Sequence, residues 1–126
     1  MRFADKKVPI RSSGLEEKKW VLESIGGTPV SKIGHTAFLV FDKARSSAGG
    51  NSSCNVFGGS YSVEADTLKI TDVISTMRAC VEDERMDIER QFLDALRETN
   101  RYKIRNNALM LYRDDRLLLT MTGGPK

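Results

Sequence analysis

The sequence predicts a mainly β protein with one α-helix. Short apolar runs separated by turn residues recur along most of the 126 residues. Only residues 83–98 show the spacing of apolar residues that is typical of an amphipathic helix. We count about seven or eight strands, and regularly spaced short strands are typical of an antiparallel sandwich or barrel.

The first half of the chain contains four predicted strands. Each is rich in strand-forming residues and is followed by Gly, Pro, Asp or Ser residues that favour turns. Residues 42–51 are polar and rich in Gly and Ser, so they are predicted to be a turn region. In the fourth strand Leu68 and Ile70 face the core and Lys69 faces solvent. The predicted strands are residues 20–25, 36–41, 58–63 and 67–73, with turns at 26–29 and 65–66.

The predicted helix covers Asp83–Glu98 and has one apolar face. It begins with acidic residues and has a basic residue near its end, which suits the helix dipole. A helix with one apolar face must pack on the sheet or close an open end of it. Pairs four residues apart, Arg85/Glu89 and Arg90/Asp94, are expected to touch on its outer face. Its apolar stripe consists of Ile88, Phe92, Ala95 and Leu96.

The last segment predicts a three-stranded meander. Its strands are residues 102–104, 108–112 and 117–121. Asn106–Asn107 and Asp114–Asp115 lie between them, and both residue types tolerate the positive φ values of tight turns.

A single domain over residues 15–122 is expected for a chain of this length. Residues 1–14 form a lead-in or linker, in which Phe3, Val8 and Ile10 could make an edge strand or belong to an upstream module. Residues 123–126 are expected to be a frayed tail. Residues 2–7 lack the apolar core of a secretion signal, so whether a signal or another domain precedes Met1 stays open.

Composition excludes several functional classes. The net charge of +3 comes from 20 basic and 17 acidic residues that are mostly scattered. We therefore expect no nucleic-acid partner, since that would need a basic face with interleaved exposed aromatics. No run approaches the roughly 18 apolar residues of a membrane helix.

The candidate catalytic and metal-binding residues predict no enzyme, no metal and no cofactor. Cys54, Cys80 and the single His35 cannot supply the four ligands of a zinc site. His35 is expected to be a loop residue, because no nucleophile motif accompanies it. Two glycine pairs could suggest a phosphate-binding loop, but the Gly-Lys-Ser/Thr that such a loop requires does not follow them. We therefore expect them to mark β-bulges or tight turns where two backbones approach closely. These pairs are Gly49–Gly50 and Gly58–Gly59. The aspartates in predicted turns lack calcium-loop spacing and are read as turn formers. They are Asp42, Asp66, Asp72, Asp114 and Asp115.

The two cysteines allow two interpretations, either one disulfide or two buried thiols. Asn55, Thr76 and Arg78 flank them and also allow two interpretations. They form a recognition surface, or Asn55 and Thr76 hydrogen-bond to backbone in turns while Arg78 pairs with an acid. Large aromatic residues are expected to fill the barrel and the helix seam, leaving it solid rather than hollow. They are Trp20, Phe38, Phe41, Phe57, Tyr61 and Phe92.

Four motifs occur in the order found in one known family. They are the Trp20–Leu22 strand ending in Ile25–Gly27, the Gly49–Tyr61 stretch, the Ile74–Cys80 stretch, and Phe92–Leu96 in the helix. Over about residues 15–121 the chain resembles the META domain of HslJ-like bacterial envelope proteins. Two residues depart from the family pattern, since Ser53 replaces a usual Gly and Val56 replaces a polar or basic residue.

The resemblance implies a partly open antiparallel β-barrel with lipocalin-like topology and the helix packed across one side. It also implies a Cys54–Cys80 disulfide, which on the chain-entropy argument contributes about 3–4 kcal/mol. An unfolded, unreduced sample should then contain no free thiol. The implied location is the periplasm or the inner face of the outer membrane, often as a lipoprotein, with membrane contact only through a lipid anchor outside this sequence.

We therefore expect a noncatalytic module that acts through contacts with a protein partner in envelope stress tolerance. The alternative is a lipocalin-like carrier of a small apolar ligand. Neither the partner, the ligand nor the oligomeric state follows from the residues.

Overall fold

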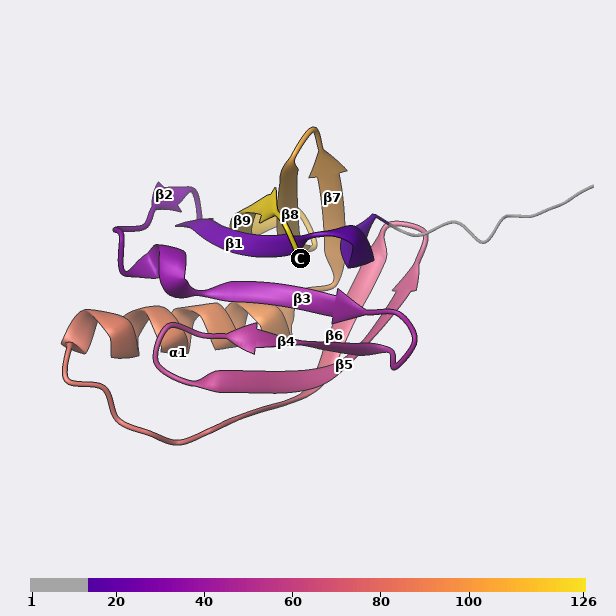
Figure 1. The fold of residues 1–126 in the computed structure, drawn as a ribbon. Coiled ribbons are helices and arrows are strands. Elements are labelled where there is room, and N and C mark those ends of the chain that lie inside the picture. The colour runs from indigo at the N-terminus through magenta and orange to yellow at the C-terminus, as the bar shows by residue number, and fades with distance from the viewer. Residues whose placement is uncertain (1–13) are drawn as a thin grey trace, which may run out of the picture.

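A computed structural model describes residues 14–126, which form one antiparallel sheet and one long helix (Figure 1). The expectations for residues 1–13 lie outside this range. The strands are β1 (Lys19–Ile25), β2 (Thr28–Pro29), β3 (Phe38–Asp42), β4 (Ser47–Asn51), β5 (Val56–Glu64), β6 (Thr67–Ser75), β7 (Arg101–Arg105), β8 (Ala108–Arg113) and β9 (Arg116–Gly124). The helices are the short 3-10 turns η1 (Leu15–Glu17) and η2 (Gly34–Thr36) and the α-helix α1 (Asp83–Glu98).

The nine strands close into a ring. Their order is β2-β1-β3-β4-β5-β6-β7-β8-β9, and β1 also pairs with β9 from Lys19↔Gly124 to Ile25↔Leu119. The ring is not a regular barrel, because β6 and β7 share the single pair Thr67↔Arg101 before they diverge. The predicted partly open β-barrel with one helix is thus confirmed.

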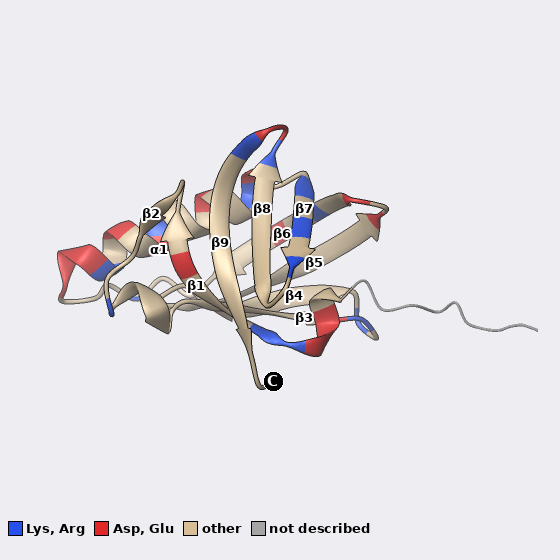
Figure 2. Ribbon diagram, turned by 90° about the horizontal axis from the view of Figure 1, so that it is seen from above, with Lys and Arg blue, Asp and Glu red and all other residues tan. Residues whose placement is uncertain are grey.

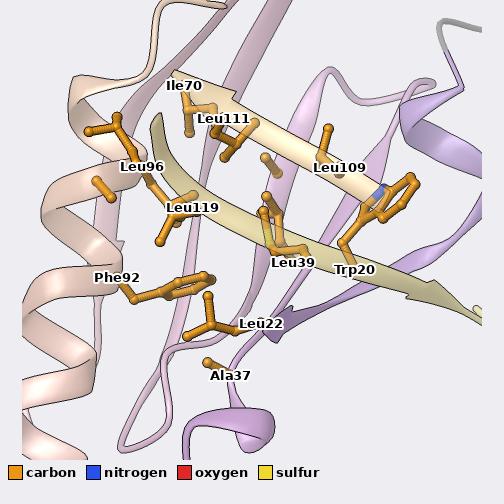
Figure 3. Packing of buried hydrophobic residues seen from close by; sticks show 14 of the residues in the cluster. Trp20, Leu22, Ala37, Leu39, Ile70, Phe92, Leu96, Leu109, Leu111 and Leu119 are labelled. Atoms are coloured by element: carbon orange, nitrogen blue, oxygen red, sulfur yellow. The ribbon is translucent and has the colours of Figure 1, made fainter. Parts of the chain in front are cut away.

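Helix α1 packs on one side of the ring, against β6, β8 and β9. The predicted bounds of the helix are confirmed, and its buried residues include Ile88, Phe92 and Leu96. Phe92 is fully buried and meets the Phe57 ring edge-on at 5.8 Å between centroids. The helix therefore buries its apolar stripe in the interior, which Figure 3 shows.

The ion pairs on α1 differ from those expected. Arg85, Arg90 and Arg97 each pair with an acid three residues earlier, at 3.2–3.6 Å. Neither Arg85/Glu89 nor Arg90/Asp94 forms. Glu89 instead turns toward the loop between β4 and β5, where polar groups of that loop reach its carboxylate. Spacing alone could not reveal this tertiary contact.

Three expectations about strands were wrong. Residues 47–51, placed in a turn region, form β4, and Thr28–Pro29, placed in a turn, form the short β2. Gly123 and Gly124, placed in the tail, continue β9 opposite Trp20 and Lys19. Most of these residues are Gly, Ala, Asn or Pro, which have low strand propensity, and pairing with neighbouring strands overrides it.

The interior is filled with side chains. Among the largest fully buried side chains are Trp20, Leu39, Phe41, Phe92 and Met121. The Phe41 and Tyr61 rings meet edge-on at 4.9 Å between centroids. Phe38 differs from the expectation, because its ring is half-buried on the outer face of β3 under the Lys19 ammonium.

Candidate interaction surface

A disulfide joins two segments that are distant in sequence. Cys54, which is 2% exposed, follows β4, and Cys80 lies in the segment between β6 and α1. Their Cα atoms are 5.9 Å apart, within the range that a disulfide spans. The disulfide interpretation of the two cysteines is therefore confirmed.

Asn55 ties the same two segments together through its side-chain amide. Its Nδ2 donates to the Arg78 carbonyl at 3.0 Å and to the Glu89 carboxylate at 3.0 Å. Its Oδ1 accepts from the Arg78 backbone N–H at 2.9 Å and from the Thr76 hydroxyl at 2.8 Å. Ser52 Oγ donates to Glu89 Oε1 at 2.7 Å. We call Ser52, Asn55, Arg78 and Glu89 the latch.

Ser53 occupies a backbone position that favours glycine. Its φ of 91° is in a region that side chains rarely adopt, which explains why a glycine would suit this position. The loop compensates with hydrogen bonds, since Asn51 Oδ1 accepts from the Ser53 N–H at 2.7 Å. The Arg85 guanidinium donates to the Ser53 carbonyl at 3.1 Å. The departure from the family pattern is thus accommodated by neighbouring polar groups.

The three residues considered for recognition have different surroundings. Asn55 is only 1% exposed, so it supports the loop and cannot meet a partner directly. Arg78 donates to the Cys54 carbonyl at 2.8 Å, and no ion pair to an acid was found for it in residues 14–126. Thr76 and Arg78 are exposed, so their role in recognition stays a prediction.

Within residues 14–126, five large apolar side chains of β5, β6, the loop before α1 and α1 itself are exposed to solvent. We call them the apolar surface, and they are Val56 (55% exposed), Ile74 (74%), Met77 (92%), Val81 (97%) and Met86 (36%). Exposed apolar clusters on small proteins commonly mark contact sites. Sequence reasoning missed this surface because apolar residues in strands and next to cysteines are normally buried. The available signal in the sequence is Val56, an apolar residue at a position where the family pattern has a polar or basic one.

Backbone pairing brings Val56 of β5 and Ile74 of β6 close together. Gly58 lies opposite Ile74, and the Thr76 N–H donates to the Val56 carbonyl at 3.0 Å. Gly58 has no side chain to separate Val56 from Ile74. The Cys80 N–H points to the Met86 sulfur at 3.5 Å, which connects α1 to the loop. The disulfide and the latch hold this loop in place.

The residues that could serve in catalysis or metal binding have structural roles instead. His35 Nδ1 lies 2.9 Å from the Leu22 carbonyl. Ser52 of the latch is fully buried. Across residues 14–126, His, Cys, Asp and Glu side chains do not assemble in threes that could hold a metal ion. In the same residues, no helix has the length and apolar character needed to cross a membrane.

The fold and this surface define a small disulfide-linked module built on a nine-stranded ring with one covering helix. The chain belongs to the META domain family, whose model matches residues 13–123. The disulfide suggests an oxidising, extracytoplasmic compartment.

Solved structures share the fold. One, titled only as an NMR structure of a protein, is 23% identical with a TM-score of 0.68, covering 86% of this chain and 91% of that one. An NMR structure of a protein from Burkholderia xenovorans is 21% identical with a TM-score of 0.72, covering 100% and 99%. A DUF4847 family protein from Bacteroides vulgatus is 14% identical with a TM-score of 0.65, covering 89% and 96%. No curated protein matches the sequence.

Proposed function

We propose that this chain is a noncatalytic module of a bacterial envelope protein that acts through protein contacts in envelope stress tolerance. The observation that carries the proposal is the apolar surface, since Met77 and Val81 are each more than nine-tenths exposed. Leaving such side chains in water forgoes burial that would contribute about 1.5–3 kcal/mol for each of them. A protein partner that covers them would recover this free energy. The stress role rests on the family resemblance.

The rigidity of the loop supports this function. Cys80 is covalently held, and the Arg78 backbone is bound on both its N–H and its carbonyl by Asn55. A surface that is already ordered loses less conformational entropy when a partner binds. We therefore assign the disulfide and the latch a positioning role for the apolar surface.

The carrier alternative gains less support. The space inside the ring is occupied by side chains such as Trp20, Phe41 and Phe92, each with an exposed fraction below 2%. A carrier needs an interior chamber or a pocket that buries most of its ligand. Contact through the outside of the ring therefore fits the packing better than carriage within it.

Site-directed photo-crosslinking in envelope preparations tests the proposal. A photoreactive residue at Met77 should give a reproducible adduct, and one at Lys43, exposed on the turn between β3 and β4, should not. The adduct should disappear when Ile74 and Val81 are both changed to Ser. The same double variant should fail to restore stress tolerance to cells lacking the protein, whereas Lys43→Ser should restore it. Equal labelling at both positions, or an adduct that survives the Ser changes, would refute the contact function.

A further inference from the structure

A second surface lies on the outer face of β7 and has a different chemistry. Arg101, Lys103 and Arg105 are exposed, while the residues between them are half-buried. Alternate residues of a strand lie about 6.5–7 Å apart on one face, so the three positive charges form a row. Figure 2 shows these blue segments along β7.

The basic row of β7 differs from the basic residues of α1 in its ion pairs. Unlike Arg85, Arg90 and Arg97 of α1, its three side chains form no ion pair within residues 14–126. Their neighbours on β8 carry no charge, since Arg101, Lys103 and Arg105 face Tyr112, Met110 and Ala108. The Lys103 ammonium lies 5.7 Å from the centre of the Tyr112 ring, in cation–π range. The positive charge is therefore a single line beside an apolar and aromatic row.

A pocket of about 160 Å³ opens at the Arg101 end of this row. Besides Arg101, Lys103 and Tyr112, its lining includes three carboxylates, those of Asp66, Asp114 and Asp115. These come from the turns between β5 and β6 and between β8 and β9. The pocket thus offers cations, hydrogen-bond acceptors and an aromatic ring together.

We propose that the basic row and this pocket bind an acidic polysaccharide. The row meets the acid groups along the chain, and the pocket takes one sugar unit, whose hydroxyls donate to the aspartates and whose ring lies against Tyr112. Carboxylates accept hydrogen bonds and cannot donate them when ionised, so they favour hydroxyl-bearing ligands. The surface is separate from the apolar surface and does not depend on the proposed function.

The same residues argue against two other anionic ligands. A chain of phosphates would bring negative charge against Asp66, Asp114 and Asp115 without hydroxyls to offer them. A flat anionic membrane would also press on these carboxylates, and the basic row has no protruding apolar residue beside it, since Met110 and Tyr112 are half-buried. A sugar chain can satisfy both the cations and the carboxylates.

The test is fluorescence anisotropy of a labelled oligogalacturonate titrated with the protein at low and high salt. The wild type should bind, with affinity that falls as salt rises because the contacts are ionic. Changing Arg101, Lys103 and Arg105 together to Gln should weaken binding about tenfold, for three exposed ionic contacts. The control changes Lys32, Lys43 and Arg45 to Gln, an equal loss of charge elsewhere, and should keep near wild-type binding. Equal melting temperatures establish that both variants are folded.

Competing probes decide the ligand class. Neutral dextran should not compete, polyphosphate of matched charge should compete more weakly than unlabelled oligogalacturonate, and phosphatidylglycerol vesicles should not retain the protein. Equal weakening by the control variant, stronger competition by polyphosphate, or retention on vesicles would each overturn the proposal. These outcomes do not bear on the apolar surface, whose variants are different.

Discussion

At the scale of the residue, Asn55 shows how one buried amide can organise a loop. Its side chain makes hydrogen bonds to the Arg78 backbone in both directions and also to Glu89 and Thr76. A buried amide is stabilising only when its donors and acceptors are satisfied. Every partner of the Asn55 side chain lies in the loop or helix that follows β6, so this side chain links the start of β5 to α1. No repeating sequence pattern signals these contacts.

Replacing Asn55 with Ala should lower the free energy of unfolding by about 2–4 kcal/mol, because the buried amide makes several hydrogen bonds that would all be lost. Urea unfolding followed by circular dichroism measures the change. The matched control is Gln91→Ala, which removes an exposed amide from α1 and should cost less than about 0.5 kcal/mol. A small effect at Asn55 would mean that the disulfide alone holds the loop.

At the scale of the element, β5 and β6 adapt to each other through a bulge between Gly58 and Ser60. A Cβ on Gly59 would lie 2.6 Å from the Thr71 carbonyl oxygen, closer than atoms tolerate. A Cβ on the neighbouring Gly58 would meet nothing within 4 Å. The expectation that this glycine pair marks a bulge is confirmed, but only Gly59 is required by close approach.

Gly59→Ala should therefore destabilise the protein by about 1–3 kcal/mol, as overpacking against backbone does. Gly58→Ala should change stability by less than about 1 kcal/mol, because alanine fits the strand there. Thermal unfolding of the two variants provides the comparison. If both glycines tolerate alanine equally well, the close approach of Thr71 to β5 is not present in solution.

At the scale of the whole molecule, contacts between distant segments hold one end of the ring. The Tyr61 hydroxyl in β5 donates to Glu16 Oε2 in η1, and the Trp20 indole donates to the Leu15 carbonyl at 2.9 Å. Burial raises the pKa of Tyr61 well above its usual value, and the hydrogen bond and negative charge of Glu16 raise it further. The folded state therefore favours the neutral phenol.

This shift predicts a pH dependence. Because the folded pKa of Tyr61 is raised, its stabilising contribution is complete below the ordinary tyrosine pKa of about 10 and is lost as the pH rises above that value. Tyr61→Phe should lower the free energy of unfolding by about 1–2 kcal/mol at neutral pH through the lost hydrogen bond. Above about pH 10 the free energy of unfolding of this variant should fall less than that of the wild type. Urea unfolding at pH 7 and about pH 11 measures both effects. Tyr112→Phe is the matched control, and an unchanged alkaline decline in Tyr61→Phe would contradict the assignment.

Much of the fold could be predicted because it depends on local patterns. The α1 bounds followed from apolar spacing, and β7, β8 and β9 followed from strand formers around Asn106 and Asp114, whose φ values are 56° and 55°. β4 could not be predicted, because Gly49 and Gly50 are there to let the Phe57 and Phe38 backbones approach, and that need exists only in the assembled sheet.

The candidate site divides in the same way. The disulfide followed from motifs that resemble a family, whereas the partners of Asn55 and Glu89 arise from tertiary contacts. Met77 and Val81 are apolar and would be expected to be buried, so only the structure could reveal that they are exposed.

The closure of the ring by β1 and β9 has a consequence for chain connectivity. Lys19 lies opposite Gly124 in antiparallel register, and the Lys126 ammonium reaches the Glu16 and Phe41 carbonyls. With residues 1–13 removed, a short linker could therefore join residue 14 to residue 126, and new termini could be opened at the exposed Ala65–Asp66 turn without breaking any strand. The architecture should tolerate such a circular permutation, because the neighbours of each strand around the ring would be unchanged.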